Sequence, residues 1–433
     1  MKLKALPPYI NRAIAVIIGL FVVLSLAYSF ADRLKLGPDE PAHFIYIRSL
    51  AIEHTPPPIS HTKTDSEEAT SSHEGHQPPL YYALMAIPYA LLNALGADQD
   101  TIWRVLRLLN IVLGAVWIYL VYLLCRAFFA EYDPAADRYA LACAAFTALI
   151  PTASYMAAVV NNDILIALLF TWAMIPMLAF FRTGKLTVKS ATLWGVIMGL
   201  AILTKAQGLV LLMMSVIAGI CACGRTGWKN YKGILRTLGI SLGMAILVSA
   251  WWFVRCQIIY GTPMPHSLYQ PAIKGGLIQL IFMHEAVELI WRTAGLLIGY
   301  FWLPYWLIEK HLPFIPYLKA LCFPIVFWLV GLIIRIRRKG SVDWRSLCLL
   351  CIAPVITYVS WMQYALTVDW GTNLQGRLLL PSAAVIAIAS ILGADGWLKS
   401  VKAKKIGFAV GCAIMLIVNI LVLWSTVTLR WGA

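Results

Sequence analysis

Long apolar stretches separated by short polar segments dominate this chain of 433 residues. A helix that crosses the hydrocarbon core of a bilayer needs about 20 mostly apolar residues. About eleven stretches approach this length, and we expect each to form a spanning helix. They lie at 13–31, 104–129, 138–159, 163–182, 191–204, 207–223, 237–257, 314–334, 346–365, 380–397 and 406–428. The pattern predicts an all-α polytopic membrane protein in which residues 1–433 form a single transmembrane domain.

Two further apolar stretches, 79–95 and 289–308, are interrupted by proline and adjoin polar segments. We expect both to be helices that lie in the membrane interface or re-enter it on the outer side. They belong to a first outer loop at 32–103 and a second large outer loop at 258–313. The first apolar run, although it follows a basic N-terminal segment, is long enough to be an uncleaved span.

Charge decides the orientation. Hydrophobic residues make up 61% of the chain and charged residues 13%, yet the net charge is +15. The lysines and arginines gather in short clusters between alternate apolar runs, which the positive-inside rule assigns to the cytoplasm. These clusters form no continuous basic face, so no nucleic-acid partner is expected. The sequence therefore predicts an integral plasma (inner) membrane protein with a cytoplasmic N-terminus.

The groups that can titrate or bind metal gather on the opposite side. With this orientation all eight histidines and most of the acidic residues face the outer, periplasmic side. A channel or carrier more often holds such groups near the middle of its spans. The distribution favours an active site on the outer face.

The first outer loop begins with the acidic pair Asp39-Glu40, followed by Pro41 at the expected start of an interfacial helix. Asp39 and His43 are four residues apart and would share one face of that helix. A catalytic carboxylate fits this position. So does a structural role, with Asp39 as the N-cap and Glu40 complementing the helix dipole.

Later in the same loop, His73, Glu74 and His76 are spaced so that they could ligate a divalent cation, the only cofactor that we expect. The spacing is weak support for a metal site, and a solvated histidine-rich loop explains it equally well.

Three charged residues interrupt apolar context on the outer side: Asp163 at the start of a span, Lys205 between two short spans, and Arg377 just before a late span. Such charges near a bilayer tend to face a partner or a wet cavity. Helix capping by Asp163, snorkelling of Lys205 and interfacial anchoring by Arg377 are the alternatives. A phosphate partner suits Arg377, because the guanidinium binds phosphate with a planar fork.

Taken in order, these motifs resemble the GT-C superfamily of membrane glycosyltransferases, especially the protein-mannosyltransferase and lipid A aminoarabinose transferase branch. The matching motifs are Asp39-Glu40, His76-Gln77-Pro78-Pro79-Leu80-Tyr81-Tyr82, Arg104-x-x-Arg107-Leu108-Leu109, Asn162-Asp163, Leu203-Thr204-Lys205 and Gln375-Gly376-Arg377-x-x-x-Pro381. Some relatives have an acidic or lysine-bearing motif where this chain has His76-Gln77, which leaves the role of that position and any use of metal open.

The resemblance implies an inverting glycosyltransferase that moves a sugar from a polyprenyl-phosphate donor to an acceptor hydroxyl on the outer face. Asp39 is the expected base and Glu40 the second choice, while Lys205 and Arg377 are expected to bind the donor phosphate. The remaining substrate-binding candidates are His43, His76, Gln77, Tyr81, Asp163 and Gln375. Expected partners are the lipid-linked donor, membrane lipids and an acceptor that is a glycan, a lipid or a protein.

Two other functions are compatible with the sequence. A polysaccharide ligase or polymerase would use a pyrophosphate-linked donor, but such proteins usually place their catalytic groups in a large late loop. A carrier or flippase for a lipid-linked sugar would move its substrate without needing a base or forming a glycosidic bond.

Overall fold

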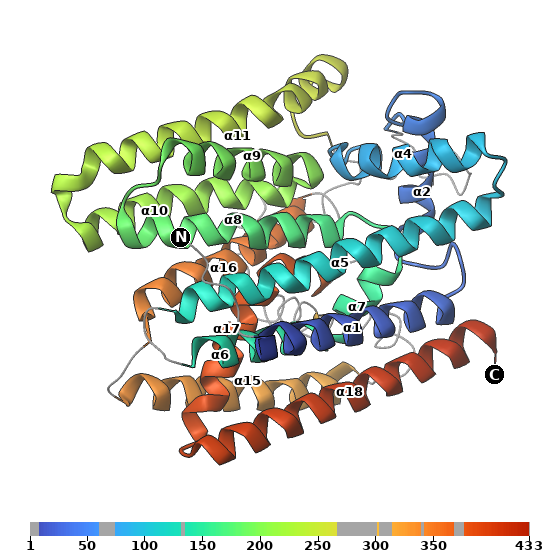
Figure 1. The fold of residues 1–433 in the computed structure, drawn as a ribbon. Helices are drawn as coiled ribbons and strands as arrows, with labels where there is room; N and C mark the ends of the chain where they lie inside the picture. The colour runs from blue at the N-terminus through green and yellow to red at the C-terminus, as the bar shows by residue number, and fades with distance from the viewer. Residues whose placement is uncertain are drawn as a thin grey trace.

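The computed structural model describes residues 8–59, 74–130, 135–265, 301–302, 314–338, 342–367 and 376–432, and every regular element in these ranges is a helix (Figure 1). Nearly all of the helices run alongside one another as a bundle. The long ones are α1 (Pro8–Ala31), α5 (Gln99–Phe129), α8 (Asp163–Thr183), α9 (Val188–Thr204), α10 (Val210–Thr226), α11 (Tyr231–Tyr260), α15 (Phe314–Arg337), α16 (Trp344–Thr367), α17 (Ala383–Trp397) and α18 (Val401–Trp431).

The predicted spans match these helices. Within the described ranges, eight helices are long and apolar enough to cross a membrane, or nine if one bent pair counts as a single span. The predicted runs at 191–204 and 314–334 fall on α9 and α15. The expectation of an all-α polytopic membrane protein is confirmed.

The run at 138–159 is not one straight helix. It consists of α6 (Ala136–Ala148) and α7 (Pro151–Ala158), which are bent by 62° at the break between them. Pro151 lies in the first turn of α7, where its missing N–H costs no hydrogen bond. Every residue of α7 is buried. The bend brings α7 against the residues that follow α1, where Tyr155 donates to Asp32, and the apolar pattern alone does not reveal it.

Two shorter helices, α2 (Glu40–Ile52) and α4 (Leu80–Ala94), pack together at one end of the bundle (right in Figure 1). The first comes from the predicted interfacial segment after Pro41, and the second matches the run at 79–95. Their position in the membrane interface stays a prediction, as do the two loop boundaries. The second outer loop lies almost entirely outside the described residues.

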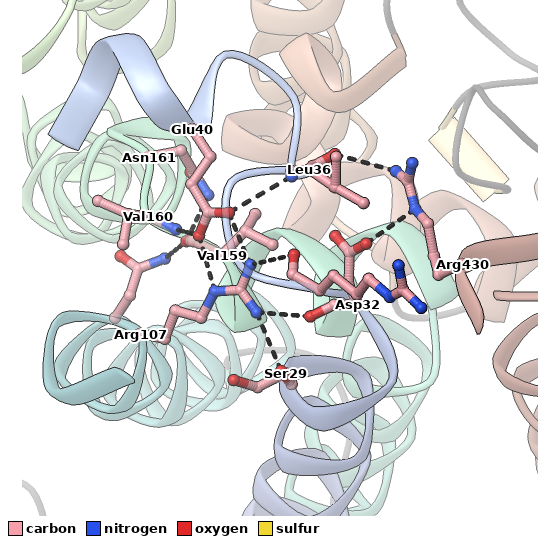
Figure 2. Close-up of polar contacts among 12 residues, drawn as sticks. Ser29, Asp32, Leu36, Glu40, Arg107, Val159, Val160, Asn161 and Arg430 are labelled. Carbon is pink, nitrogen blue, oxygen red and sulfur yellow. Dashed lines mark hydrogen bonds and ion pairs between the residues drawn. The ribbon is translucent and has the colours of Figure 1, made fainter. Parts of the chain in front are cut away.

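A buried ion pair attaches α2 to the bundle. Both carboxylate oxygens of Glu40 accept hydrogen bonds from the Arg107 guanidinium of α5, at 2.7 and 2.6 Å, and both side chains are fully buried. Arg107 also donates to the backbone carbonyls of Ser29 and Asp32 at 2.9 Å, while Glu40 accepts from the backbone N–H of Val160 (Figure 2). Charges in such a setting are tolerated only when they are paired and hydrogen-bonded. The pair therefore fixes the start of α2 against α1, α5 and the segment after α7.

A second buried carboxylate connects the C-terminal helix to the same loop. Asp32 forms an ion pair with Arg430 of α18 at 2.9 Å and accepts a hydrogen bond from the Tyr155 hydroxyl at 2.6 Å. Arg430 also donates to the backbone carbonyl of Leu36 (Figure 2). Burial raises the pKa of Asp32, and these partners oppose that rise. The end of α18 and the end of α1 are thus joined through one carboxylate.

Ion pairs also close the opposite end of the bundle. Asp343 pairs with Arg182 at 3.2 Å and Arg225 at 3.1 Å, and Asp395 pairs with Lys404 at 2.5 Å. The three cations belong to the basic clusters that the sequence analysis assigns to the cytoplasm. The structure gathers them at one end, while the direction of that end relative to the membrane stays a prediction.

We expect Glu40→Gln to destabilise the protein by about 3–5 kcal/mol, because the Arg107 charge would stay buried without its counter-ion. Thermal unfolding in detergent, followed by circular dichroism, would measure the loss. Glu53→Gln is the matched control, since Glu53 caps the other end of α2 and is exposed. Equal unfolding temperatures for the two variants would contradict the structural role of Glu40.

Candidate active site

Asp39 occupies the residue before α2 in an unusual backbone conformation. Its φ is 55°, in the left-handed region that aspartate and asparagine tolerate better than most side chains. Asp39 is the N-cap residue by position, but its side chain makes no capping hydrogen bond. The carboxylate instead contacts the Arg377 guanidinium. Asp39 therefore does not act as an ordinary capping residue, because its carboxylate binds an arginine rather than the backbone N–H groups of α2.

Asp39 opens onto a cavity of about 420 Å³ between the α2–α4 end and the helices beside it. Its lining includes apolar and aromatic residues, among them Val210 and Met213 of α10, Trp252 of α11 and Trp361 of α16. The polar lining consists of Asp39, His43, Glu74, His76, Gln77, Lys205, Gln207, Thr357, Ser360 and Arg377. A ligand with a charged head and an apolar tail would find a matching surface for each part.

Two cations are held at the cavity by one buried acid. Asp163, the first residue of α8, accepts a hydrogen bond from the Lys205 ammonium at 2.5 Å and lies 3.6 Å from an Nη atom of Arg377. Lys205 and Arg377 line the cavity, whereas Asp163 lies behind them and does not. Because Arg377 also contacts Asp39, the two cations are balanced by two carboxylates, of which only Asp39 lines the cavity.

A hydrogen bond also fixes the two cation-bearing segments relative to each other. Gln207, in the turn η1 (Ala206–Leu209), donates from Nε2 to the backbone carbonyl of Leu378 at 2.6 Å. Leu378 directly follows Arg377 in the turn η3 (Gly376–Ser382), and Gln207 is two residues after Lys205. The spacing between the ammonium and the guanidinium is therefore constrained by the backbone as well as by Asp163.

His43 faces the cavity one turn after Asp39. Its Nδ1 is 2.9 Å from the Tyr82 hydroxyl, and the two rings stack with centroids 5.7 Å apart. Burial lowers the pKa of His43, so the neutral imidazole is favoured near pH 7. The Tyr82 hydroxyl also accepts a long hydrogen bond from Asn162.

The structure brings most of the predicted site residues to one cavity. Asp39, His43, Glu74, His76, Gln77, Lys205 and Arg377 line it. Glu40 and Tyr81 do not: Glu40 binds Arg107, and the fully buried Tyr81 hydroxyl accepts a hydrogen bond from the Asn161 backbone. The predicted residues His73 and Gln375 lie outside the described part of the chain.

A metal centre gains no support from the described ranges, which contain no group of three or more histidine, cysteine, aspartate or glutamate residues arranged to hold a metal ion. Glu74 and His76 do line the cavity. The expected divalent cation stays a prediction.

Several residues that shape the site are not among the predicted site residues. Arg107 is one of them, although a charge just inside a predicted span is itself a signal for a buried partner. Gln207 and the α16 residues Thr357 and Trp361 carry no sequence signal, since polar and aromatic residues occur in many spans. Their place at the cavity follows only from helix packing.

No protein-family model matches the sequence, and no curated protein sequence matches it. Among solved structures, the fold is similar to that of ArnT from Cupriavidus metallidurans bound to undecaprenyl phosphate. The TM-score is 0.53 and the identity 16%, over 99% of this chain and 71% of that chain.

Two structures of the Archaeoglobus fulgidus oligosaccharyltransferase are also similar. One is tethered with an acceptor peptide (TM-score 0.51, 14% identity, 95% of this chain, 55% of that chain). The other, named AglB, is in complex with an inhibitory peptide and a dolichol-phosphate (TM-score 0.51, 12% identity, 95% and 56%). The present chain spans little more than half the length of these oligosaccharyltransferase chains.

At such low identities the likeness establishes the fold, and it agrees with the helical bundle and its membrane-length helices. This protein has the fold of the GT-C membrane glycosyltransferases.

Proposed function

We propose that this multi-pass membrane protein is an inverting glycosyltransferase, which transfers a sugar from a polyprenyl-phosphate donor to an acceptor hydroxyl at the outer face of the membrane. The observation that carries the proposal is the meeting of Asp39, Lys205 and Arg377 at one cavity whose lining also includes apolar and aromatic side chains. A base, two cations and a place for a lipid tail are the parts that this reaction needs.

The fold neighbours support the choice of donor. The ArnT structure contains undecaprenyl phosphate, and the AglB structure contains a dolichol-phosphate. Both ligands join a phosphate to a long polyprenyl chain. In the present chain, the phosphate would lie against Lys205 and Arg377, and the prenyl chain would pass along the apolar lining residues Val210, Met213 and Trp252.

In the proposed reaction, the Asp39 carboxylate takes the proton of the acceptor hydroxyl. The acceptor oxygen then forms a bond to the anomeric carbon of the sugar, opposite the phosphate. The bond between that carbon and the phosphate oxygen breaks, and its electron pair leaves with the polyprenyl phosphate. Because attack and departure occur on opposite faces, the anomeric configuration inverts.

Arg377 has two roles in this scheme. It contacts the Asp39 carboxylate and lies near Asp163. A bound donor phosphate would be a further anionic partner for the guanidinium and would compete with Asp39 for it. The charge that develops on the leaving phosphate is stabilised by the same guanidinium and by Lys205.

The direct test is a panel of polyprenyl-phosphate sugars given to the purified protein, with measurement of free polyprenyl phosphate and of the new glycosidic bond. Formation of both products is expected with at least one sugar. A carrier would move the lipid across a vesicle membrane and form neither product.

We expect Asp39→Asn to lower the rate at which polyprenyl phosphate is released by at least about 100-fold, because the amide cannot act as the base. Asparagine also tolerates the left-handed backbone conformation, so the unfolding temperature should stay near that of the wild type. Asp98→Asn is the matched control: Asp98 caps α5 through a hydrogen bond from Thr101 and is exposed. Full activity in Asp39→Asn would show that the base is another group.

Arg377→Lys should lower the rate on the order of 100-fold, since a point charge cannot serve a phosphate and a carboxylate with a planar fork. Initial rates at saturating and limiting donor would measure the effect. Arg104→Lys provides the comparison, because Arg104 is an exposed residue of α5 that does not line the cavity. Wild-type rates in Arg377→Lys would remove this residue from the phosphate site.

A further inference from the structure

Thr357 of α16 differs from most other buried hydroxyl residues in the bundle. Its side chain lines the cavity and is 1% exposed, yet Oγ1 has no hydrogen-bond partner among the described residues. In comparable helical positions, Ser215, Ser241, Ser249 and Thr426 each donate to the carbonyl four residues earlier, at 2.7–2.9 Å. A buried hydroxyl without a partner is costly, which makes it a good candidate for a ligand contact.

Gln207 presents a second such atom. Its Nε2 is engaged with the Leu378 carbonyl, which sets the orientation of the amide. Its Oε1 is buried and has no hydrogen-bond partner within the described ranges, although the residue lines the same cavity. An amide oxygen can only accept a hydrogen bond. It repels a phosphate oxygen and attracts a hydroxyl group.

The surroundings of Thr357 suit a sugar. Ser360 and Trp361 also line the cavity from α16, and their spacing of three and four residues from Thr357 places all three on one helix face. A hydroxyl, an amide oxygen and a large aromatic side chain together provide neutral hydrogen bonds and an apolar surface for the C–H groups of a sugar ring.

We propose that Gln207 and Thr357 form a subsite that binds hydroxyl groups of the donor sugar. The assignment to the donor rests on the proposed function, and on the position of Gln207 between the segments that carry Lys205 and Arg377. The sugar is bonded directly to the phosphate, so a phosphate at these cations places the nearest sugar hydroxyls beside Gln207. The acceptor would instead approach from Asp39.

The test compares two lipids in equilibrium binding to the protein in nanodiscs: polyprenyl phosphate without a sugar, and the polyprenyl-phosphate sugar that the wild type binds best. Thr357→Val removes the hydroxyl and keeps the shape of the side chain. We expect it to weaken binding of the sugar-bearing lipid by about three- to tenfold, the size of one neutral hydrogen bond. Binding of bare polyprenyl phosphate should not change.

Two further variants control for packing. Thr357→Ser retains the hydroxyl and should restore most of the affinity for the sugar-bearing lipid. Thr426→Val removes a buried hydroxyl that donates within α18 and does not line the cavity, so it should leave both affinities unchanged. Gln207→Leu is less suitable, because it also removes the hydrogen bond to Leu378.

Equal effects of Thr357→Val on the two lipids, or no effect on either, would overturn the subsite. If Thr357→Val binds a free monosaccharide more weakly than the wild type does but binds the sugar-bearing lipid equally well, the subsite does not bind the donor sugar. The proposed function has its own test: it is wrong if the wild type releases polyprenyl phosphate from none of the donors. In that case, a selective loss of affinity for the sugar-bearing lipid in Thr357→Val would still support the subsite.

Discussion

The buried pair of Glu40 and Arg107 is the interaction on which the candidate site depends. It fixes the first turn of α2 against α5 and the segment after α7, with both oxygens of the carboxylate engaged by the guanidinium. Asp39 directly precedes this anchor, so the position of its carboxylate follows from the pair. Glu40, the first residue of α2, faces the protein interior, whereas Asp39, in the left-handed conformation just before the helix, lines the cavity.

A second buried acid, Asp163, positions the two cations of the cavity. Asp163 holds the ammonium of Lys205 and lies beside the guanidinium of Arg377, although these two residues are far apart in sequence. The hydrogen bond between Gln207 and Leu378 fixes the same two segments through the backbone. Because these contacts already hold the two cations in place, the side chains need to move little when an anion binds, whereas water molecules would have to reorient around it. The tight contacts of Glu40 and Asp163 thus supply structure, and the cavity-facing groups supply the proposed chemistry.

The apolar part of the cavity lining gives a reason for placing such a site within a membrane protein. Residues of α10, α11 and α16 line the same space as the charged groups. A lipid-linked substrate has both kinds of surface within one molecule, so it can be bound without leaving the bilayer. Gln207 Oε1 and Thr357 Oγ1, which have no hydrogen-bond partner among the described residues, belong to the same lining.

The sequence by itself determined the all-helical membrane class, the order of the apolar helices, the clustering of basic residues, and which acids and cations are candidates for the site. These follow from hydrophobic length and from the cost of charge near lipid, which are local properties of the chain. Only the tertiary structure showed that Glu40 pairs with Arg107 while Asp39 lines the cavity, because those contacts depend on where Arg107 lies. It also decided the bend between α6 and α7, and the contribution of Gln207 and Thr357. Those features arise from contacts between distant helices, and such contacts leave no periodic pattern along the chain.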